Sequence, residues 1–381
     1  MTRSRLACTT VAALLTFGAL AQFPQREQLP EGSAALATNI NRNSYPRILQ
    51  DNSLMFRLMA PDAKLVQVDI CGKKYDMTKN ADGVWSGKSE RIVSGIQYYS
   101  LIVDGVSVND PGSETFFGCG RMMSCVEVPY LDGGKQYQIQ DVPHGCVRTE
   151  HYFSNVTKSW RTMYVYTPAG YDSDKDKKYP VFYIIHGGGE DCRGWVNQGR
   201  GNIILDNLAA EGKAVPMILV SLDANVAGYE AVEKEIMDNI VPFVEKNYRV
   251  DARPEMRAIG GLSMGGLYTM HVGMPHNDFF AYLGVFSSGW FADRPDGNFT
   301  SPADNCYKYL EANKDQFNKN IKLLWLSQGS PSDIAYNNCK VMMQKLDAMG
   351  IKYEFYDSKE GGHTWPVWRE DLYLFAQRLF K

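Results

Sequence analysis

The sequence lacks the features that mark several common classes of protein. Its 40 Lys and Arg residues are outnumbered by 43 Asp and Glu, so it has no basic surplus with which to bind nucleic acid. No CxxC pair and no Cys/His cluster has the spacing of zinc ligands. No apolar run beyond the N-terminus is long enough to cross a membrane. We therefore expect no metal site, no nucleic-acid partner and no membrane span.

The N-terminal segment is typical of a secretory signal peptide. A short basic stretch, "MTRSR", precedes the apolar run "LACTTVAALLTFGAL", and Ala19-Leu20-Ala21 fits the small-residue pattern of a cleavage site. We expect removal of residues 1–21 and export of a chain that begins at Gln22, to the periplasm or the extracellular space.

Cysteine is scarce, with eight residues in the whole chain, and Cys8 lies in the predicted signal peptide. The remaining seven are an odd number, so at least one thiol is unpaired within the mature chain. Buried free cysteines are the interpretation that we favour. One or two disulfides are the alternative in an oxidising compartment.

Residues 50–130 have the rhythm of short strands. Apolar side chains alternate in "SLMFRLMAP" and "KLVQVDI", and the dipeptide Asp104-Gly105 divides 96–111 as the turn of a hairpin would. No segment of helical length shows helical periodicity in this part. The pattern predicts a small β-sandwich.

From about residue 160, apolar runs of strand length alternate with helical segments. Several runs are apolar throughout, as buried parallel strands are. The expected strands are 162–168, 179–187, 216–223, 256–261, 281–288, 321–329 and 352–358, and the expected helices are 202–212, 231–248, 266–275, 337–350 and 367–380. This alternation predicts an α/β fold whose mostly parallel sheet is covered on both faces. The expected segments are a signal peptide at 1–21, a β-sandwich with its leader at 22–135, a linker with a first edge strand at 136–160, and the α/β domain at 161–381.

The stretch "AIGGLSMGGLYTM" contains a Gly-x-Ser-x-Gly motif between a predicted strand and a predicted helix. This is the context of a nucleophile elbow, in which a tight turn projects the serine hydroxyl from the edge of the sheet. Gly261 and Gly265 leave room where side chains would clash. We predict that Ser263 is a nucleophile and that the Met264 N–H faces the developing oxyanion. A structural glycine turn is the alternative.

A serine nucleophile needs a base and an acid, which follow it along the chain in this fold. His271 and His276 fall on or just after the elbow helix, whereas His363 lies in the glycine-rich loop "KEGGHTWPVW" beyond a strand. We predict His363 as the base. Asp333 is the carboxylate in the loop after the preceding strand, and we predict it as the acid, with Asp357 as the competitor.

A second oxyanion donor is expected from the three glycines that follow the strand in "VFYIIHGGGED". Gly187 or Gly188 is the predicted donor, and His186 is predicted to hold the loop. Four further residues fall near predicted strand ends and are candidates for lining the substrate pocket, with ordinary packing as the alternative: Trp195, Asn225, Trp290 and Trp365.

With these motifs in place, the chain resembles the esterase-D-like enzymes of the α/β-hydrolase superfamily. "YPVFYIIHGGGED", "RAIGGLSMGG" and "GGHTWPVWREDLYLF" are similar to carbohydrate esterase family one, the feruloyl and acetyl xylan esterases. The resemblance implies that Ser263, His363 and Asp333 are nucleophile, base and acid. "FRLMAPDAKLVQVDI" and "VNDPGSETFFGCGR" resemble the immunoglobulin-like (E-set) N-terminal domain of secreted esterases.

The expected function is therefore that of a secreted serine esterase that needs no cofactor. Its expected partner is acylated hemicellulose such as xylan, or its oligosaccharides, with feruloyl favoured over acetyl as the acyl group removed. An acetyl xylan esterase, a siderophore-type esterase and a non-enzymatic glycan-binding protein are the alternatives.

Overall fold

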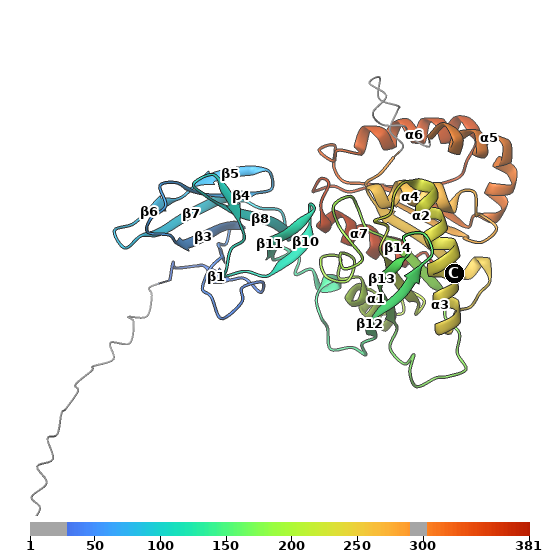
Figure 1. The fold of residues 1–381 in the computed structure, drawn as a ribbon, viewed down its shortest axis with the longest axis horizontal. Helices are drawn as coiled ribbons and strands as arrows, with labels where there is room; N and C mark the ends of the chain where they lie inside the picture. Colours follow the sequence, from blue (N-terminus) through green and yellow to red (C-terminus); the bar gives the residue numbers. More distant parts are fainter. Residues whose placement is uncertain (1–28, 290–302) are drawn as a thin grey trace, which may run out of the picture.

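The computed structural model describes residues 29–289 and 303–381. Within them lie two antiparallel sheets from the first part of the chain and one large mixed sheet from the rest. Figure 1 shows the first part, in blue and teal, as a lobe whose β10–β11 end abuts the larger lobe. The predicted signal peptide lies outside the described residues. None of the helices in the described ranges is long and apolar enough to cross a bilayer.

The front lobe is a β-sandwich, as predicted, and we call it the front sandwich. One sheet has the order β1-β2-β3-β7-β6 and the other β10-β11-β8-β4-β5, with β9 paired to β8. Apolar residues alternate along its strands and meet in one core, which includes Phe56, Val68 and Tyr99. The strands are β1 (Ala34–Ala35), β2 (Arg47–Ile48), β3 (Ser53–Met59), β4 (Val66–Ile70), β5 (Lys73–Asp76), β6 (Thr78–Lys79), β7 (Val84–Arg91), β8 (Gly95–Val103), β9 (Val106–Val108), β10 (Thr115–Gly118) and β11 (Arg121–Val128).

The dipeptide Asp104-Gly105 forms the predicted turn between β8 and β9. Both residues have positive φ, 48° and 86°, which matches the twist of a two-residue hairpin.

The large sheet has the order β12-β13-β15-β14-β16-β17-β18-β19. β12 and β13 pair antiparallel at one edge, and the strands from β15 onward are parallel. Its central strands are buried along their whole length, as their continuous apolar sequences predict. The strands are β12 (Cys146–Ser154), β13 (Ser159–Thr167), β14 (Val181–Ile185), β15 (Ile218–Leu222), β16 (Arg257–Leu262), β17 (Tyr282–Phe286), β18 (Leu323–Gln328) and β19 (Glu354–Asp357).

Helices cover both faces of this sheet, which confirms the predicted fold class. α1 (Gly201–Ala210) and α7 (Trp365–Ala376) pack with one apolar core. The other face carries α2 (Tyr229–Lys234), a π-helical stretch (Glu235–Ile240), α3 (Val241–Asn247), α4 (Met264–Gly273), α5 (Ala303–Asn320) and α6 (Tyr336–Met349). Helix α5 was not among the helices expected from the sequence. It is rich in Asn and Lys and has a kink at Asn313.

A buried ion pair joins the front sandwich to α7. The guanidinium of Arg369, which is 0% exposed, donates to both carboxylate oxygens of Glu127 on β11, at 2.7 and 3.1 Å. Its Nε also donates to the Gln198 carbonyl at 2.7 Å. This bidentate geometry holds the two lobes in one orientation.

We predict that Arg369→Ala lowers the free energy of unfolding by about 3 kcal/mol, because it removes the bidentate partner of the Glu127 carboxylate and leaves it only the longer contact with Arg200, at 3.3 Å. Urea denaturation measures this change. The matched control is Arg91→Ala, since Arg91 pairs with Glu360 between the same two lobes but both side chains are at least half exposed. Arg91→Ala is expected to lower the free energy of unfolding by at most about 1 kcal/mol. Equal effects of the two substitutions would contradict the prediction.

Candidate active site

Ser263 stands at the turn between β16 and α4 with φ 53° and ψ −117°, a conformation that side chains rarely adopt. Its N–H donates to the Phe286 carbonyl at 2.8 Å, and its carbonyl accepts the Ser288 hydroxyl at 2.8 Å. The two motif glycines permit this turn. A Cβ on Gly265 would lie 2.5 Å from the His186 carbonyl oxygen, and one on Gly261 would lie 2.6 Å from the Gly265 backbone.

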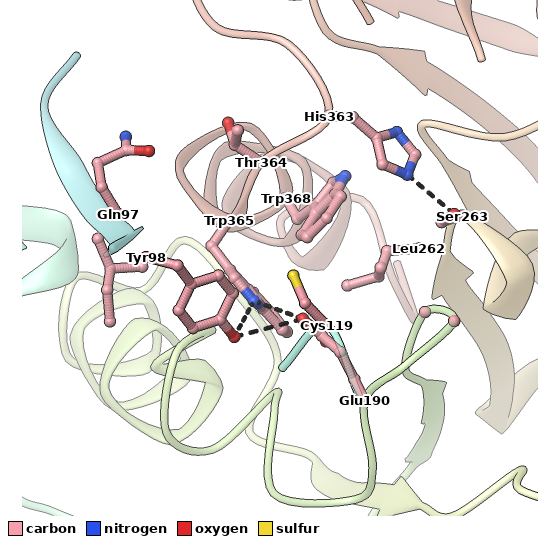
Figure 2. Close-up of a pocket in the computed structure, with 13 residues that line it drawn as sticks. Gln97, Tyr98, Cys119, Glu190, Leu262, Ser263, His363, Thr364, Trp365 and Trp368 are labelled. Atoms are coloured by element: carbon pink, nitrogen blue, oxygen red, sulfur yellow. Dashed lines mark hydrogen bonds between the residues drawn. The ribbon is translucent and has the colours of Figure 1, made fainter. Parts of the chain in front are cut away.

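The structure brings the three predicted side chains into one hydrogen-bonded row. Ser263 Oγ lies 2.9 Å from His363 Nε2, and His363 Nδ1 lies 2.9 Å from Asp333 Oδ1 (Figure 2). If Nδ1 carries the proton that it donates to the carboxylate, Nε2 can accept the serine proton. Asp357, the competing candidate for the acid, is the last residue of β19 and accepts a hydrogen bond from the Tyr336 hydroxyl.

Close contact between two loops positions this row. The Ser330 N–H donates to the Gly361 carbonyl at 2.8 Å, which joins the loop of Asp333 to the loop of His363. Burial raises the pKa of Asp333, but hydrogen bonds from His363 and from the Ala335 N–H outweigh it, so the pKa is below its ordinary value. Asp333 is therefore charged at neutral pH and can stabilise an imidazolium.

The predicted oxyanion loop lies directly beside Ser263. A Cβ on Gly187 would lie 3.5 Å from the Ser263 Cβ, and both Gly187 and Gly188 line the same cavity as Ser263. His186 holds this loop, as predicted, with Nδ1 at 2.8 Å from the Gly187 carbonyl and Nε2 accepting the Ala224 N–H at 3.1 Å. Met264 is the first residue of α4, so its N–H is at the helix N-terminus.

A cavity of about 170 Å³ opens next to Ser263 and His363. Its walls are largely apolar, include the rings of Tyr98, Trp365 and Trp368, and come from both lobes. The front sandwich contributes Ile96, Gln97, Tyr98 and Cys119, and the large lobe contributes Gly187, Gly188, Glu190, Leu262, Ser263, His363, Thr364, Trp365 and Trp368. Figure 2 shows Tyr98, Glu190 and Trp365 joined by hydrogen bonds on one side, with Ser263 and His363 on the other.

Glu190 is a buried acid in this wall, 5% exposed. Its Oε1 accepts the Trp365 indole N–H at 2.9 Å and the Tyr98 hydroxyl at 3.4 Å, while Oε2 has no hydrogen-bond partner among the described residues. Burial raises the pKa of Glu190 to about 8, although the two hydrogen bonds oppose it. At neutral pH this carboxyl is therefore largely uncharged.

The other predicted pocket residues are distributed differently. Trp365 lines the cavity, but Trp195 is 0% exposed and lies beneath it, donating to the Ile185 carbonyl at 2.9 Å. Trp195 is therefore not a pocket residue, because its indole fills the core under Trp365, at a ring-centroid distance of 5.3 Å. Asn225 is also outside the cavity lining and donates to the Glu190 carbonyl at 2.8 Å. Trp290 lies outside the described residues.

Sequence reasoning missed Tyr98, Cys119, Glu190 and Trp368. Glu190 directly follows the glycines of "HGGGED", and that adjacency was a usable signal. Tyr98 and Cys119 belong to the front sandwich, and no motif linked them to Ser263. All seven cysteines in the described residues are unpaired. Four of them are buried, as the favoured interpretation expects, but Cys71, Cys119 and Cys146 are exposed.

Residues 154–378, more than half of the chain, match the protein family described as "Putative esterase". The chain belongs to this family. It is an esterase-family hydrolase related to feruloyl esterases, which confirms the resemblance found in its sequence.

The chain is also similar to individual esterases of known sequence or structure. An endo-1,4-beta-xylanase/feruloyl esterase from Xylanibacter ruminicola is 32% identical over 354 residues, which are 88% of this chain and 46% of that protein. The chain thus spans less than half of that relative's length. A solved ferulic acid esterase is 28% identical with a TM-score of 0.55, over 62% of this chain and 99% of that one. An enterochelin esterase from Shigella flexneri has a TM-score of 0.67 at 16% identity, over 88% of this chain and 94% of that one, and thus shares the fold of both lobes.

We predict that Glu190→Gln changes how stability depends on pH. The ordinary glutamate pKa is 4.5 and the folded value is about 8, so between these values the folded chain binds more protons at Glu190 than the unfolded chain. This group therefore lowers the free energy of unfolding as pH rises through that window, by roughly 1 kcal/mol per pH unit.

Denaturation of the two proteins at a series of pH values measures the effect. The fall should be shallower in Glu190→Gln than in the wild type. The control is Glu211→Gln on the exposed end of α1, which should follow the wild-type curve. If the free energy of unfolding falls equally steeply with pH in Glu190→Gln and in the wild type, Glu190 is not an uncharged buried acid at neutral pH.

Proposed function

We propose that the esterase hydrolyses aromatic acyl esters of plant cell-wall polysaccharide, with feruloyl as the preferred acyl group, and that it acts after export. The observation that carries this proposal is the cavity beside Ser263, whose walls include the rings of Tyr98, Trp365 and Trp368. Flat aromatic walls suit a planar aromatic acyl chain. The names of two relatives, each called a feruloyl or ferulic acid esterase, support the same choice.

In the first half of the proposed reaction, Ser263 attacks the ester carbonyl. His363 Nε2 accepts the hydroxyl proton across the 2.9 Å contact as the bond forms. The negatively charged Asp333 holds the ring in the required tautomer and stabilises its positive charge. The N–H groups of Met264 and of Gly187 or Gly188 bind the oxyanion of the tetrahedral intermediate.

In the second half, His363 returns the proton to the leaving alcohol oxygen and the acyl group stays on Ser263. A water then attacks this acyl-enzyme as His363 accepts its proton, and His363 returns that proton to Ser263 Oγ as the carboxylic acid leaves. His363 thus carries the proton in both halves, and water is the second reactant besides the ester.

The size of the cavity favours an aromatic over an acetyl group. Its volume of about 170 Å³ is roughly ten times the roughly 10–15 Å³ that a cavity needs to hold one water molecule. An acetyl methyl would leave most of these apolar walls without contact, whereas an aromatic ring would bury them and gain binding free energy.

We predict that Asp333→Asn lowers kcat by roughly 10³- to 10⁴-fold with little change in KM, because an amide stabilises the wrong imidazole tautomer. Steady-state kinetics on an ester substrate measures the loss. Asp357→Asn is the matched control, because Asp357 ends the strand before His363 without contacting its ring, and its kcat should stay within about twofold. A larger loss in Asp357→Asn than in Asp333→Asn would reassign the acid.

The function itself is tested with methyl ferulate, acetylated xylan and p-nitrophenyl acetate, for the wild type and for Ser263→Ala. We expect the highest kcat/KM on methyl ferulate and a fall of at least about 10³-fold in the variant. Turnover of acetyl esters alone would contradict the feruloyl preference. Absence of Ser263-dependent turnover on every ester would contradict the esterase mechanism.

A further inference from the structure

The ring of His186 links the oxyanion loop to the loop that follows β15. Its Nε2 accepts the Ala224 N–H at 3.1 Å, and its Nδ1 lies 2.8 Å from the Gly187 carbonyl. Because a backbone N–H can only donate, Nε2 is the accepting nitrogen and Nδ1 carries the proton. The Asp223 carboxylate lies farther from Nε2, at 3.4 Å, and its Oδ1 accepts the Asn225 N–H at 3.0 Å. The ring therefore donates to the Gly187 carbonyl and holds it in place.

The peptide group between Gly187 and Gly188 carries this contact to the cavity. In a planar trans peptide the C=O and the N–H point in opposite directions. The Gly187 carbonyl faces His186, so the Gly188 N–H points away from the ring. Gly188 lines the cavity at Ser263, and its N–H has no hydrogen-bond partner among the described residues. Of the two predicted donors of this loop, the His186 contact thus fixes the direction of the Gly188 N–H.

Arg161 on β13 holds the peptide group on the other side of the ring. Its Nη2 donates to the Asp223 carbonyl at 2.8 Å and its Nη1 to the Asn225 carbonyl at 3.1 Å, so one guanidinium binds both neighbours of Ala224. The Asp223 carbonyl and the Ala224 N–H belong to one planar peptide group. A carbonyl held by Arg161 therefore points the N–H at His186.

Buried groups hold Arg161 in turn. Its side chain is 9% exposed, and its Nε lies 3.2 Å from the carboxylate of Glu235. Glu235 is 1% exposed and accepts the hydroxyls of Tyr152 and Ser154 at 2.7 and 2.6 Å. Two carboxylates, those of Glu235 and Asp223, lie within 3.4 Å of the guanidinium and oppose its charge. Its effect on the site therefore comes from the two carbonyls that it orients.

We propose that Arg161 is a positioning residue of the oxyanion hole, which acts through the Asp223–Ala224 peptide and His186 on the Gly188 N–H. The inference rests on the proposed function and adds to it a residue on a strand that does not line the cavity at Ser263. An N–H that is oriented before the ester arrives stabilises the oxyanion without reorganisation. Loss of this orientation weakens binding of the tetrahedral intermediate and leaves binding of the planar ester unchanged.

Steady-state kinetics on methyl ferulate tests the proposal in Arg161→Gln and in Arg161→Lys. Neither side chain reproduces the planar fork that binds both carbonyls, and the lysine keeps the charge. Because a displaced donor costs less than a deleted one, we expect kcat to fall roughly 10- to 100-fold in both variants, with KM within about twofold. A rise in KM at unchanged kcat would place Arg161 in substrate binding and contradict the proposal.

An arylboronic acid gives a readout that a general structural defect would not move. Its boron forms a tetrahedral anionic adduct with Ser263 Oγ, which needs the same N–H donors as the oxyanion. The inhibition constant of this probe should rise by the factor by which kcat/KM falls in each Arg161 variant. An unchanged inhibition constant beside a reduced kcat/KM would contradict the positioning role.

A double-mutant cycle tests whether Arg161 acts through His186. If it does, Arg161→Gln should lower kcat by less than about twofold in a His186→Ala background, because the contact that it orients is already lost. Equal fold-losses in the two backgrounds would show that Arg161 does not act through the ring.

The matched control is Arg257→Gln. Arg257 is 5% exposed and pairs with Glu245 at 3.0 Å, but it lies at the end of β16 opposite to Ser263, so kcat should stay within about twofold. If the wild type hydrolyses an ester and folded Arg161 variants keep its kcat, the inference is wrong and the proposed function stands. If the wild type shows no Ser263-dependent turnover, the proposed function is wrong and this inference falls with it.

Discussion

The close approach of α4 to β14 and β16 is the constraint on which the rest of the site depends. No side chain fits at Gly265, where a Cβ would lie 2.5 Å from a backbone oxygen of the neighbouring loop. This contact forces the chain to turn at Ser263 with a positive φ, a conformation that costs about 1–3 kcal/mol and persists only because neighbouring strands hold it. The same contact brings the serine hydroxyl, the first N–H of α4 and the glycine loop after β14 to one point. A serine elsewhere on the sheet would have none of these neighbours.

The front sandwich contacts the glycine loop and supplies part of the cavity wall beside Ser263. Its β10–β11 turn donates a hydrogen bond from the Gly120 N–H to the Gly189 carbonyl at 2.8 Å, directly on the glycine loop. Tyr98 closes the cavity opposite Ser263. The buried pair of Arg369 and Glu127 holds these parts together, so lobe orientation, cavity shape and oxyanion loop are coupled through a few polar contacts. The walls of the cavity beside Ser263 thus belong to both lobes.

The geometry of the Ser263, His363 and Asp333 row could be predicted from sequence, because it depends on local motifs and on chain order. Gly-x-Ser-x-Gly after a strand predicted the elbow, and the order serine, acid, histidine placed Asp333 and His363 within hydrogen-bonding distance of their partners. The pocket walls could not be predicted in the same way. Tyr98 reaches the cavity only through lobe packing, and Trp195 lies under it because a neighbouring indole, Trp365, occupies the surface position. Helix α5 was missed because its sequence is polar on average and has no long apolar run, although its few apolar residues, such as Leu310 and Phe317, lie on one buried face.

The proposed mechanism requires that the acyl group is transferred to Ser263 inside this cavity. Rapid acid quenching during turnover of a feruloyl ester, followed by peptide mass spectrometry, tests it directly. We predict a feruloyl group, ferulic acid less one water, on the peptide that contains Ser263. A feruloyl group on the peptide of Cys119, whose side chain borders the same cavity, would contradict the claim. So would undiminished turnover by Ser263→Ala.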